Sequence, residues 1–206
     1  MLKIKSKLKI NKIKPDWSKT GDLAYMISND NINMILSQFD DVESERKKFI
    51  YIPIIYWRKN IRKKIFENLN KHFVTCRTRT ICPDIGIVVY IKYHWLSLYV
   101  DMQKREIRYF ESNADDKIRY KMIPLIKRIR ESMFDTSSPV ALIYNNHSIQ
   151  TDDYSCGLYA IDFITMNIED RSYRRWLTSF IKYKTEYGQK HYEKKIMEMR
   201  KKYFKI

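Results

Sequence analysis

The sequence predicts an α+β fold, in which helices flank a mixed and mostly antiparallel central β-sheet. Residues 85–110 contain three successive runs that are rich in β-branched and aromatic residues, as β-strands are. Helical patterns precede and follow this stretch, and a sheet of this kind flanked by helices is typical of the α+β class. The chain of 206 residues shows no internal repeat and no long linker, so we expect residues 16–206 to form one domain.

The first third of the chain is expected to hold two helices and one strand. Residues 1–15 alternate apolar residues with lysines, which predicts an edge strand or a flexible basic arm. Asn29-Asp30 can cap a helix that runs to Phe39. Tyr51–Ile55 has the pattern of a short buried strand, and Trp57–Lys71 that of a basic amphipathic helix. The inward face of that helix would carry Ile61, Ile65 and Leu69.

The centre of the chain is expected to form the sheet, and its end a set of helices. A helix is predicted over about residues 116–131, interrupted by Pro124, with one more strand at Pro139–Tyr144. The expected central strands are Ile85–Ile91, His94–Val100 and Glu106–Phe110, with a hairpin loop around Gln103-Lys104. The expected C-terminal helices are Ser155–Asn167, Arg171–Lys184 and Gln189–Tyr203.

Composition narrows the functional classes. The chain has 40 Lys and Arg against 24 acidic residues, and its formal charge of +16 favours polyanionic partners such as nucleic acid, an anionic membrane or acidic protein surfaces. Four glycines leave no glycine-rich phosphate loop. No apolar run approaches the roughly 20 residues that span a bilayer, and no secretory signal is visible, so we expect no membrane partner. Three cysteines in no paired framework indicate a reducing compartment.

Cys156 is the candidate nucleophile of the chain. It follows the turn Asp152-Asp153-Tyr154 and begins a helical run, so the positive end of a helix dipole should favour its thiolate. Gly157 leaves room beside the sulfur for a substrate backbone. Cys76 and Cys82 lack both features, and we expect them to be small buried apolar residues. With His72 they would form a metal site one ligand short, so neither a metal ion nor another cofactor is expected.

His94 is the candidate base, because it lies on a strand whose hairpin partner carries an acid. With a two-residue turn at Gln103-Lys104, Glu111 lies opposite Leu96 and diagonal to His94 on the same face of the sheet. Asn113 would then face His94 directly. Glu111 is therefore the first candidate for the residue that orients the imidazole, and Asn113 the second. Among the other histidines, His147 is the competitor, since it lies close before Gln150.

Gln150 lies six residues before the thiol. Its side-chain amide, together with the backbone N–H of Cys156, would stabilise the oxyanion that forms when the thiolate attacks a carbonyl group. An ordinary polar loop residue would have the same sequence context, so the spacing alone leaves both readings open. Trp95 and Gly157, which follow the base and the nucleophile, are expected to contact the substrate.

Four elements in this order, namely His94-Trp95, Phe110-Glu111-Ser112, Gln150 and Tyr154-Ser155-Cys156-Gly157, resemble the ubiquitin-like-protein protease superfamily. This superfamily of cysteine peptidases includes deSUMOylating enzymes and the adenovirus maturation protease, adenain. The resemblance covers residues 25–170. It implies a mixed sheet packed between helices, His94 as base, Glu111 as its orienting acid, Gln150 as oxyanion donor and Cys156 as nucleophile.

Two departures from the superfamily pattern indicate a viral maturation protease. Deconjugating members usually carry Asp at the third position and a Trp-Leu-Asn-Asp-like opening, whereas this chain has Glu111, as adenain does, and Ile27-Ser28-Asn29-Asp30. No cysteine lies between Glu111 and Cys156, so the disulfide-tethered activator of adenain has no counterpart. We therefore expect a monomeric endopeptidase that cleaves viral capsid or core precursors, with Gly-containing cleavage sites, in the virion or the infected-cell cytoplasm.

Two other functions stay open at this point. One is a deconjugating protease for SUMO or another ubiquitin-like modifier. The other is a basic nucleic-acid-binding protein whose peptidase-like core is inert, although an intact His, Glu, Gln and Cys set argues against it. For the viral protease, DNA is an expected non-specific partner. The candidate contacts are Lys3, Lys5, Lys7 and Lys9, then Arg62, Lys63 and Lys64, with Arg200, Lys201 and Lys202 as a further group.

Overall fold

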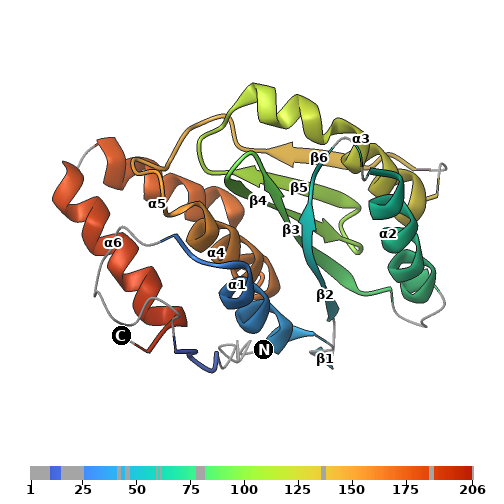
Figure 1. Ribbon diagram of the computed structural model, residues 1–206, viewed down its shortest axis with the longest axis horizontal. Coiled ribbons are helices and arrows are strands. Elements are labelled where there is room, and N and C mark those ends of the chain that lie inside the picture. The colour runs from blue at the N-terminus through green and yellow to red at the C-terminus, as the bar shows by residue number, and fades with distance from the viewer. Residues whose placement is uncertain are drawn as a thin grey trace, which may run out of the picture.

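A computed structural model of the chain describes residues 10–14, 26–40, 43–44, 47–58, 60, 62–77, 82–135, 138–185 and 188–205. Within these residues, six strands form one sheet in the order β1-β2-β3-β4-β5-β6 (Figure 1). β3, β4 and β5 pair antiparallel, whereas β2 and β6 run parallel to their inner neighbours, so the sheet is mixed as predicted. The strands are β1 (Glu43–Ser44), β2 (Lys47–Tyr56), β3 (Asp84–Ile91), β4 (His94–Asp101), β5 (Glu106–Glu111) and β6 (Ala141–Tyr144).

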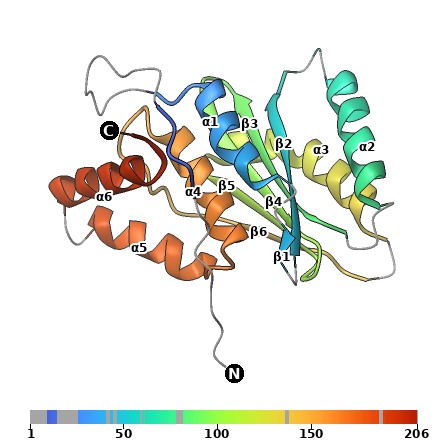
Figure 2. The ribbon, with the colours of Figure 1, turned by 90° about the horizontal axis from the view of Figure 1, so that it is seen from below.

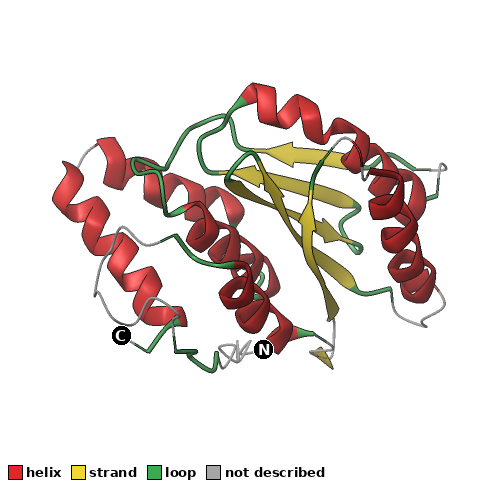
Figure 3. Cartoon of the chain, in the orientation of Figure 1, coloured by secondary structure: helices red, strands yellow, loops and turns green. Residues whose placement is uncertain are grey.

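Helices cover both faces of this sheet, which confirms the α+β class (Figure 3). α2 and α3 lie on one face, α1 and α4 on the other, and α5 with α6 form an outer layer against α4 (Figure 2). A short 3₁₀ turn, Ser37–Phe39, extends α1. The helices are α1 (Asn29–Leu36), α2 (Arg62–Arg77), α3 (Asp116–Met133), α4 (Cys156–Ile168), α5 (Tyr173–Thr185) and α6 (Gly188–Tyr203).

The core has two halves, one on each side of the sheet. Every residue of β4 is buried, because helices cover both of its faces. Trp95 and Tyr99 belong to the cluster on the α4 side, whereas Leu96 and Leu98 belong to the cluster on the α2 and α3 side. Since strand side chains alternate between faces, His94 lies on the same face as Leu96.

The prediction of a helix from Trp57 is wrong at residues 57 and 58, which lie in neither a helix nor a strand. β2 continues to Tyr56, and the backbone N–H of Trp57 donates to the carbonyl of Tyr90 at 2.9 Å. The indole N–H of Trp57 donates to the carbonyl of Lys121 at 3.1 Å, which holds this residue between the sheet and α3. These long-range contacts displace the helix start to Arg62, and α2 then runs on to Arg77. Leu69 faces the core as expected, and Ile61 lies outside the described residues.

Two smaller predictions about helices are also wrong. Ser28, not Asn29-Asp30, caps α1, and its hydroxyl accepts from the N–H of Asn31 at 3.2 Å. α3 is not interrupted at Pro124 but runs from Asp116 to Met133. Pro124 lies on the exposed side of α3, where water can bond the carbonyl that has lost its intrahelical partner.

Part of the predicted N-terminal arm packs on the domain. Ile13 is buried and forms a parallel bridge with Phe204, through backbone bonds to Tyr203 and Lys205 of 3.1 and 2.9 Å. Residues 10–14 therefore lie against the C-terminal segment. Residues 1–9, and with them the proposed contacts Lys3, Lys5, Lys7 and Lys9, lie outside the described part of the chain.

Candidate active site

Four elements begin or end together at one end of the sheet. β4 begins at His94, β5 ends at Glu111, α3 begins after its cap Asp115, and α4 begins at Cys156. Strand ends and helix starts leave side chains and backbone N–H groups free for chemistry. The structure therefore gathers three of the predicted site residues from segments that are far apart in the sequence.

The hairpin between β4 and β5 sets the position of the acid. Glu111 pairs with Leu96, which is the register expected from the sequence, although the turn comprises the four residues Met102–Arg105 rather than two. His94 Nε2 lies 2.5 Å from Glu111 Oε1. Asn113 is exposed, and its backbone N–H donates to Glu111 Oε1 at 2.7 Å. Of the two candidates, the structure places Glu111 next to the imidazole.

The carboxylate of Glu111 is fully buried and held from several sides. Besides Asn113, the backbone N–H of Asp115 donates to Glu111 Oε2 at 2.6 Å. The side chain of Asn145 bonds both backbone groups of Glu111, accepting from its N–H at 3.1 Å and donating to its carbonyl at 2.6 Å. The sequence analysis did not predict the role of Asn145. The residues around a polar side chain that follows a strand do not indicate that its partner lies 34 positions away.

The imidazole of His94 lies between Glu111 and Cys156. Burial lowers the pKa of His94, but hydrogen bonds with the side chains of Cys156 and Glu111, and the charges of these groups, raise the pKa to about 9 overall. The ring is therefore protonated at neutral pH. A protonated imidazole that is hydrogen-bonded to a cysteine sulfur stabilises the thiolate, which is the nucleophilic form of cysteine.

Cys156 is the first residue of α4, and its side chain is 1% exposed. The helix dipole places partial positive charge at this end of α4, which also favours a thiolate. Gly157 packs tightly, because a Cβ at this position would lie 3.1 Å from Trp95 Cδ1 and 3.3 Å from Ile27 Cβ. The missing side chain thus lets α4 approach the sheet, and both Trp95 and Gly157 are buried against each other.

The loop before Cys156 is organised around Asp152. Its Oδ1 accepts from the backbone N–H groups of Tyr154 and Ser155 at 3.0 and 2.7 Å, and its Oδ2 accepts from the Ser155 hydroxyl at 2.8 Å. The hydroxyl of Tyr192 on α6 donates to the same Oδ2 at 3.2 Å. The sequence predicted a turn here but not that α6 would support it.

Gln150 is buried and directed by its neighbours. Its Oε1 accepts from the Ser112 hydroxyl at 2.6 Å, and its Nε2 donates to the Asp152 carbonyl at 2.5 Å with Asp152 Oδ1 at 3.3 Å. The amide is thus held between the end of β5 and the loop that leads to Cys156. Gln150 Nε2 donates to Asp152 in this structure, so one of its N–H groups has to turn away from Asp152 before it can donate to a substrate oxygen.

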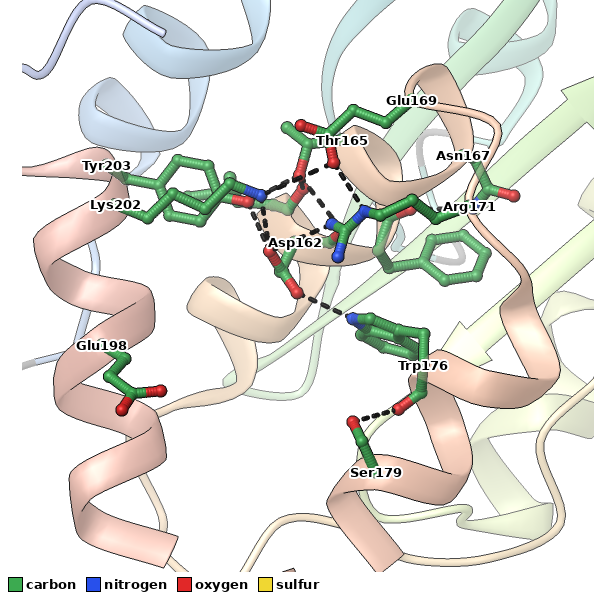
Figure 4. Close-up of polar contacts among 12 residues, drawn as sticks. Asp162, Thr165, Asn167, Glu169, Arg171, Trp176, Ser179, Glu198, Lys202 and Tyr203 are labelled. Carbon is green, nitrogen blue, oxygen red and sulfur yellow. Dashed lines mark hydrogen bonds and ion pairs between the residues drawn. The ribbon is translucent and has the colours of Figure 1, made fainter. Parts of the chain in front are cut away.

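A second polar cluster fastens the middle of α4 to α5 and α6 (Figure 4). Asp162 is buried and accepts from Trp176 Nε1 at 2.7 Å and from the Tyr203 hydroxyl at 2.5 Å. Lys202 Nζ lies 3.1 Å from Asp162 Oδ1. Burial opposes ionisation, but Lys202 and these hydrogen bonds lower the pKa of Asp162 overall. The cluster keeps the helix that carries Cys156 in place against the outer layer.

The remaining predicted residues lie elsewhere. His147 is exposed in the loop before Gln150, and His72 and His191 are exposed on α2 and α6. Cys82 is half-buried, and the side chain of Cys76 lies outside the described part of the chain. Lys63 and Lys64 are exposed on α2, whereas the Arg62 guanidinium stacks 4.9 Å from the Trp57 ring centroid. Arg200 is 1% exposed and therefore wrong as a surface contact for DNA.

Within the described residues, the structure contains neither a metal site nor a membrane-spanning helix. No group of three or more His, Cys, Asp or Glu side chains there is arranged to hold a metal ion. None of the helices in that part of the chain is both long and apolar enough to cross a membrane.

The chain is similar to known proteases in sequence and in structure. A family model described as the Ulp1 protease family, C-terminal catalytic domain, matches residues 29–202. The protein named "Putative thiol protease R355" from Acanthamoeba polyphaga mimivirus is 28% identical over 71 residues, which is 34% of this chain and 24% of that protein. The chain thus spans about a quarter of the length of this relative.

Two solved structures show the same fold. The ASFV pS273R protease has a TM-score of 0.63 and 18% identity, over 95% of this chain and 72% of that one. The C-terminal Ulp1 protease domain, solved in complex with Smt3, the yeast ortholog of SUMO, has a TM-score of 0.56 and 12% identity, over 82% of this chain and 80% of that one.

Proposed function

The chain belongs to the Ulp1 protease family of cysteine peptidases, and from this premise we propose that Cys156, His94, Glu111 and Gln150 are its catalytic residues. The observation that carries the proposal is the contact series from Glu111 through His94 to Cys156, with 2.5 Å between Glu111 Oε1 and His94 Nε2. The series follows the logic of a catalytic triad, in which an acid orients the base and the base serves the nucleophile.

The geometry supports the following reaction. The Cys156 thiolate attacks the scissile carbonyl carbon, and the backbone N–H of Cys156 and a redirected N–H of Gln150 stabilise the oxyanion. Protonated His94 gives its proton to the leaving amine as the C–N bond breaks and a thioester forms. Neutral His94 then takes a proton from water, which attacks the thioester and frees Cys156 and the new carboxyl group.

The substrates we propose are viral capsid or core precursors, cleaved at Gly-containing sites in the virion or in the infected-cell cytoplasm. The similarity to a mimivirus protein that is named a thiol protease supports a viral role, as does the fold shared with the ASFV protease. Glu111 at the third position and the charge of +16 agree with this assignment.

Deconjugation of a ubiquitin-like modifier is the second candidate function. The observation that favours it is the shared fold with the Ulp1 domain that was solved with Smt3. A modifier-directed enzyme would release a whole folded modifier from a lysine side chain, whereas a maturation protease would cut within extended precursor segments.

We also propose that DNA binds the enzyme without sequence preference. The exposed Lys63 and Lys64 at the start of α2 are the described residues that support this interaction best. Phosphate contacts of this kind weaken steeply with salt, because binding releases counterions. A gel shift between about 20 and 200 mM salt tests the proposal, and an absence of binding at the lower concentration refutes it.

Cleavage assays separate the two candidate activities. The purified chain is incubated with Gly-containing peptides, with viral structural precursors and with SUMO or ubiquitin conjugates, and Cys156→Ala serves as control. Cleavage of precursors alone supports the maturation role, and release of a modifier supports deconjugation. If Cys156→Ala retains activity, the proposed nucleophile is wrong.

A further inference from the structure

Basic side chains from three separate elements border the candidate active site. Lys92 lies in the turn between β3 and β4, Lys117 and Lys121 lie on the first turns of α3, and Arg58 follows β2. None of these four forms an ion pair with another side chain in the part of the chain that the structure describes. They are therefore free to interact with a ligand. We refer to them as the basic rim.

The backbone places this rim beside the catalytic groups. Lys92 is two residues before His94, and Ile91 pairs directly with His94 across the turn. α3 starts next to Glu111, because the N–H of its cap residue Asp115 bonds the Glu111 carboxylate at 2.6 Å. Lys117 and Lys121 are four residues apart and so lie on one side of α3.

Arg58 is connected to the site through Tyr90. The centroid of the Tyr90 ring lies 4.4 Å from that of the Trp95 ring. The charges of Cys156 and Arg58 both act on the Tyr90 hydroxyl, which therefore lies near both groups. Next to Lys92, Tyr93 is 83% exposed, and next to Lys121, Tyr120 is 64% exposed. Exposed aromatic rings among cations provide apolar contacts for a peptide chain that crosses the rim.

Two features of the rim are energetically unfavourable. The ammonium groups of Lys92 and Lys121 lie in mutual contact, and this contact lowers the pKa of Lys121. The turn residues Lys92 and Tyr93 both have left-handed backbones, with φ of 49° and 63°, at positions that favour Gly or Asn. A bound anion between the two ammonium groups would relieve their repulsion.

We propose that the basic rim binds a carboxylate side chain of the substrate, so that the enzyme prefers Asp or Glu close to the scissile bond. This inference rests on the proposed function, because it assumes that a peptide is cleaved at Cys156. A peptide carboxylate fits better than duplex DNA, since the rim is confined to the surroundings of Cys156 and its cations alternate with exposed tyrosines. Any peptide that is cleaved at Cys156 has to lie beside the basic rim.

The test uses the double variant K92E/K121E, with K127E as matched control. Lys127 is also on α3, but it is 73% exposed and lies beyond the rim. The first measurement is the alkylation rate of Cys156 by anionic iodoacetate relative to neutral iodoacetamide. The double variant changes four units of charge; for charges about 10 Å from the thiolate, the ratio should fall about fivefold to tenfold at low salt and less than twofold at about 0.5 M salt. K127E should leave the ratio unchanged.

The second measurement identifies cleavage sites in a peptide library by mass spectrometry. Wild type should show Asp and Glu enriched within about three residues of the cut, and K92E/K121E should lose or reverse this enrichment while cleaving neutral peptides. If neither wild type nor K92E/K121E shows a charge preference in labelling or in cleavage, the inference is wrong and the proposed function still holds. Loss of DNA binding in K92E/K121E with an unchanged peptide preference also overturns it, in favour of a nucleic-acid contact. If wild-type Cys156 is neither labelled nor active in cleavage, both the inference and the proposed function are wrong.

Discussion

Replacing Glu111 by Gln tests the proposed catalytic arrangement at its best-defined contact. The carboxylate accepts hydrogen bonds from the backbone N–H groups of Asn113 and Asp115 at 2.7 and 2.6 Å and lies 2.5 Å from His94 Nε2. Gln has nearly the same shape but only one acceptor oxygen. Its NH₂ group must therefore face at least one of these three donors, inside a fully buried site.

The size of the effect follows from the lost interactions. A hydrogen bond to a charged group contributes about 1.5–3 kcal/mol, and one pKa unit corresponds to about 1.4 kcal/mol. The pKa of His94, about 9 in the wild type, should therefore fall by about one to two units in Glu111→Gln. The free energy of unfolding should fall by about 1–3 kcal/mol, because a buried donor loses its acceptor.

Nuclear magnetic resonance of ¹³C-labelled histidine measures this pKa directly and needs no substrate. The His94 signal is assigned by its absence in His94→Asn, which separates it from the three exposed histidines. Glu198→Gln, at a half-exposed carboxylate on α6, is the matched control and should leave the titration unchanged. A wild-type His94 that titrates near 6.5, or one that Glu111→Gln does not shift, would refute the proposed pairing.

Four further predictions follow from the same geometry. Cys156→Ser should abolish cleavage and leave the fold intact. Iodoacetamide should label Cys156 of the wild type before the other cysteines, because the thiolate is the reactive form. If peptide mapping finds another cysteine labelled first, this prediction is wrong. The folded-state pKa of His94, about 9, lies above its unfolded value of about 6.5, so its contribution to stability is complete below about pH 6.5 and lost as pH rises through about 9. Urea unfolding of wild type and His94→Asn at pH 6 and 9.5 should show the difference shrinking; a constant difference argues against a raised pKa. Asp162→Ala should destabilise the protein by about 2–4 kcal/mol in chemical denaturation, because Trp176 Nε1 loses its acceptor, while Tyr203 and Lys202 each lose one partner and keep Thr165 and Glu169; a loss below about 1 kcal/mol speaks against the cluster. Gly157→Ala should cost about 1–3 kcal/mol and lower activity, because its Cβ would press on Trp95 at 3.1 Å; unchanged melting and activity would show that α4 can move.

Local patterns in the sequence determined most of the sheet and the likeness of its site to a cysteine peptidase. Alternation and β-branched residues predicted β3, β4 and β5, because a strand that is buried on both faces needs such residues throughout. The register that brings Glu111 to His94 followed from a short hairpin, in which the position of the turn sets every pair. The start of α4 at Cys156 was also close to its predicted place, since the turn and the apolar run are local signals.

Only the tertiary structure decided the features that depend on contacts between distant segments. The end of β2 at Tyr56 rather than a helix from Trp57 depends on β3 and α3. The supports of the site, Asn145 beside Glu111 and Asp152 beneath Cys156, depend on partners from other elements. Local sequence sets backbone preferences worth fractions of a kcal/mol per residue, whereas burial and buried hydrogen bonds contribute about 1 kcal/mol or more each, so long-range packing prevails where the two conflict.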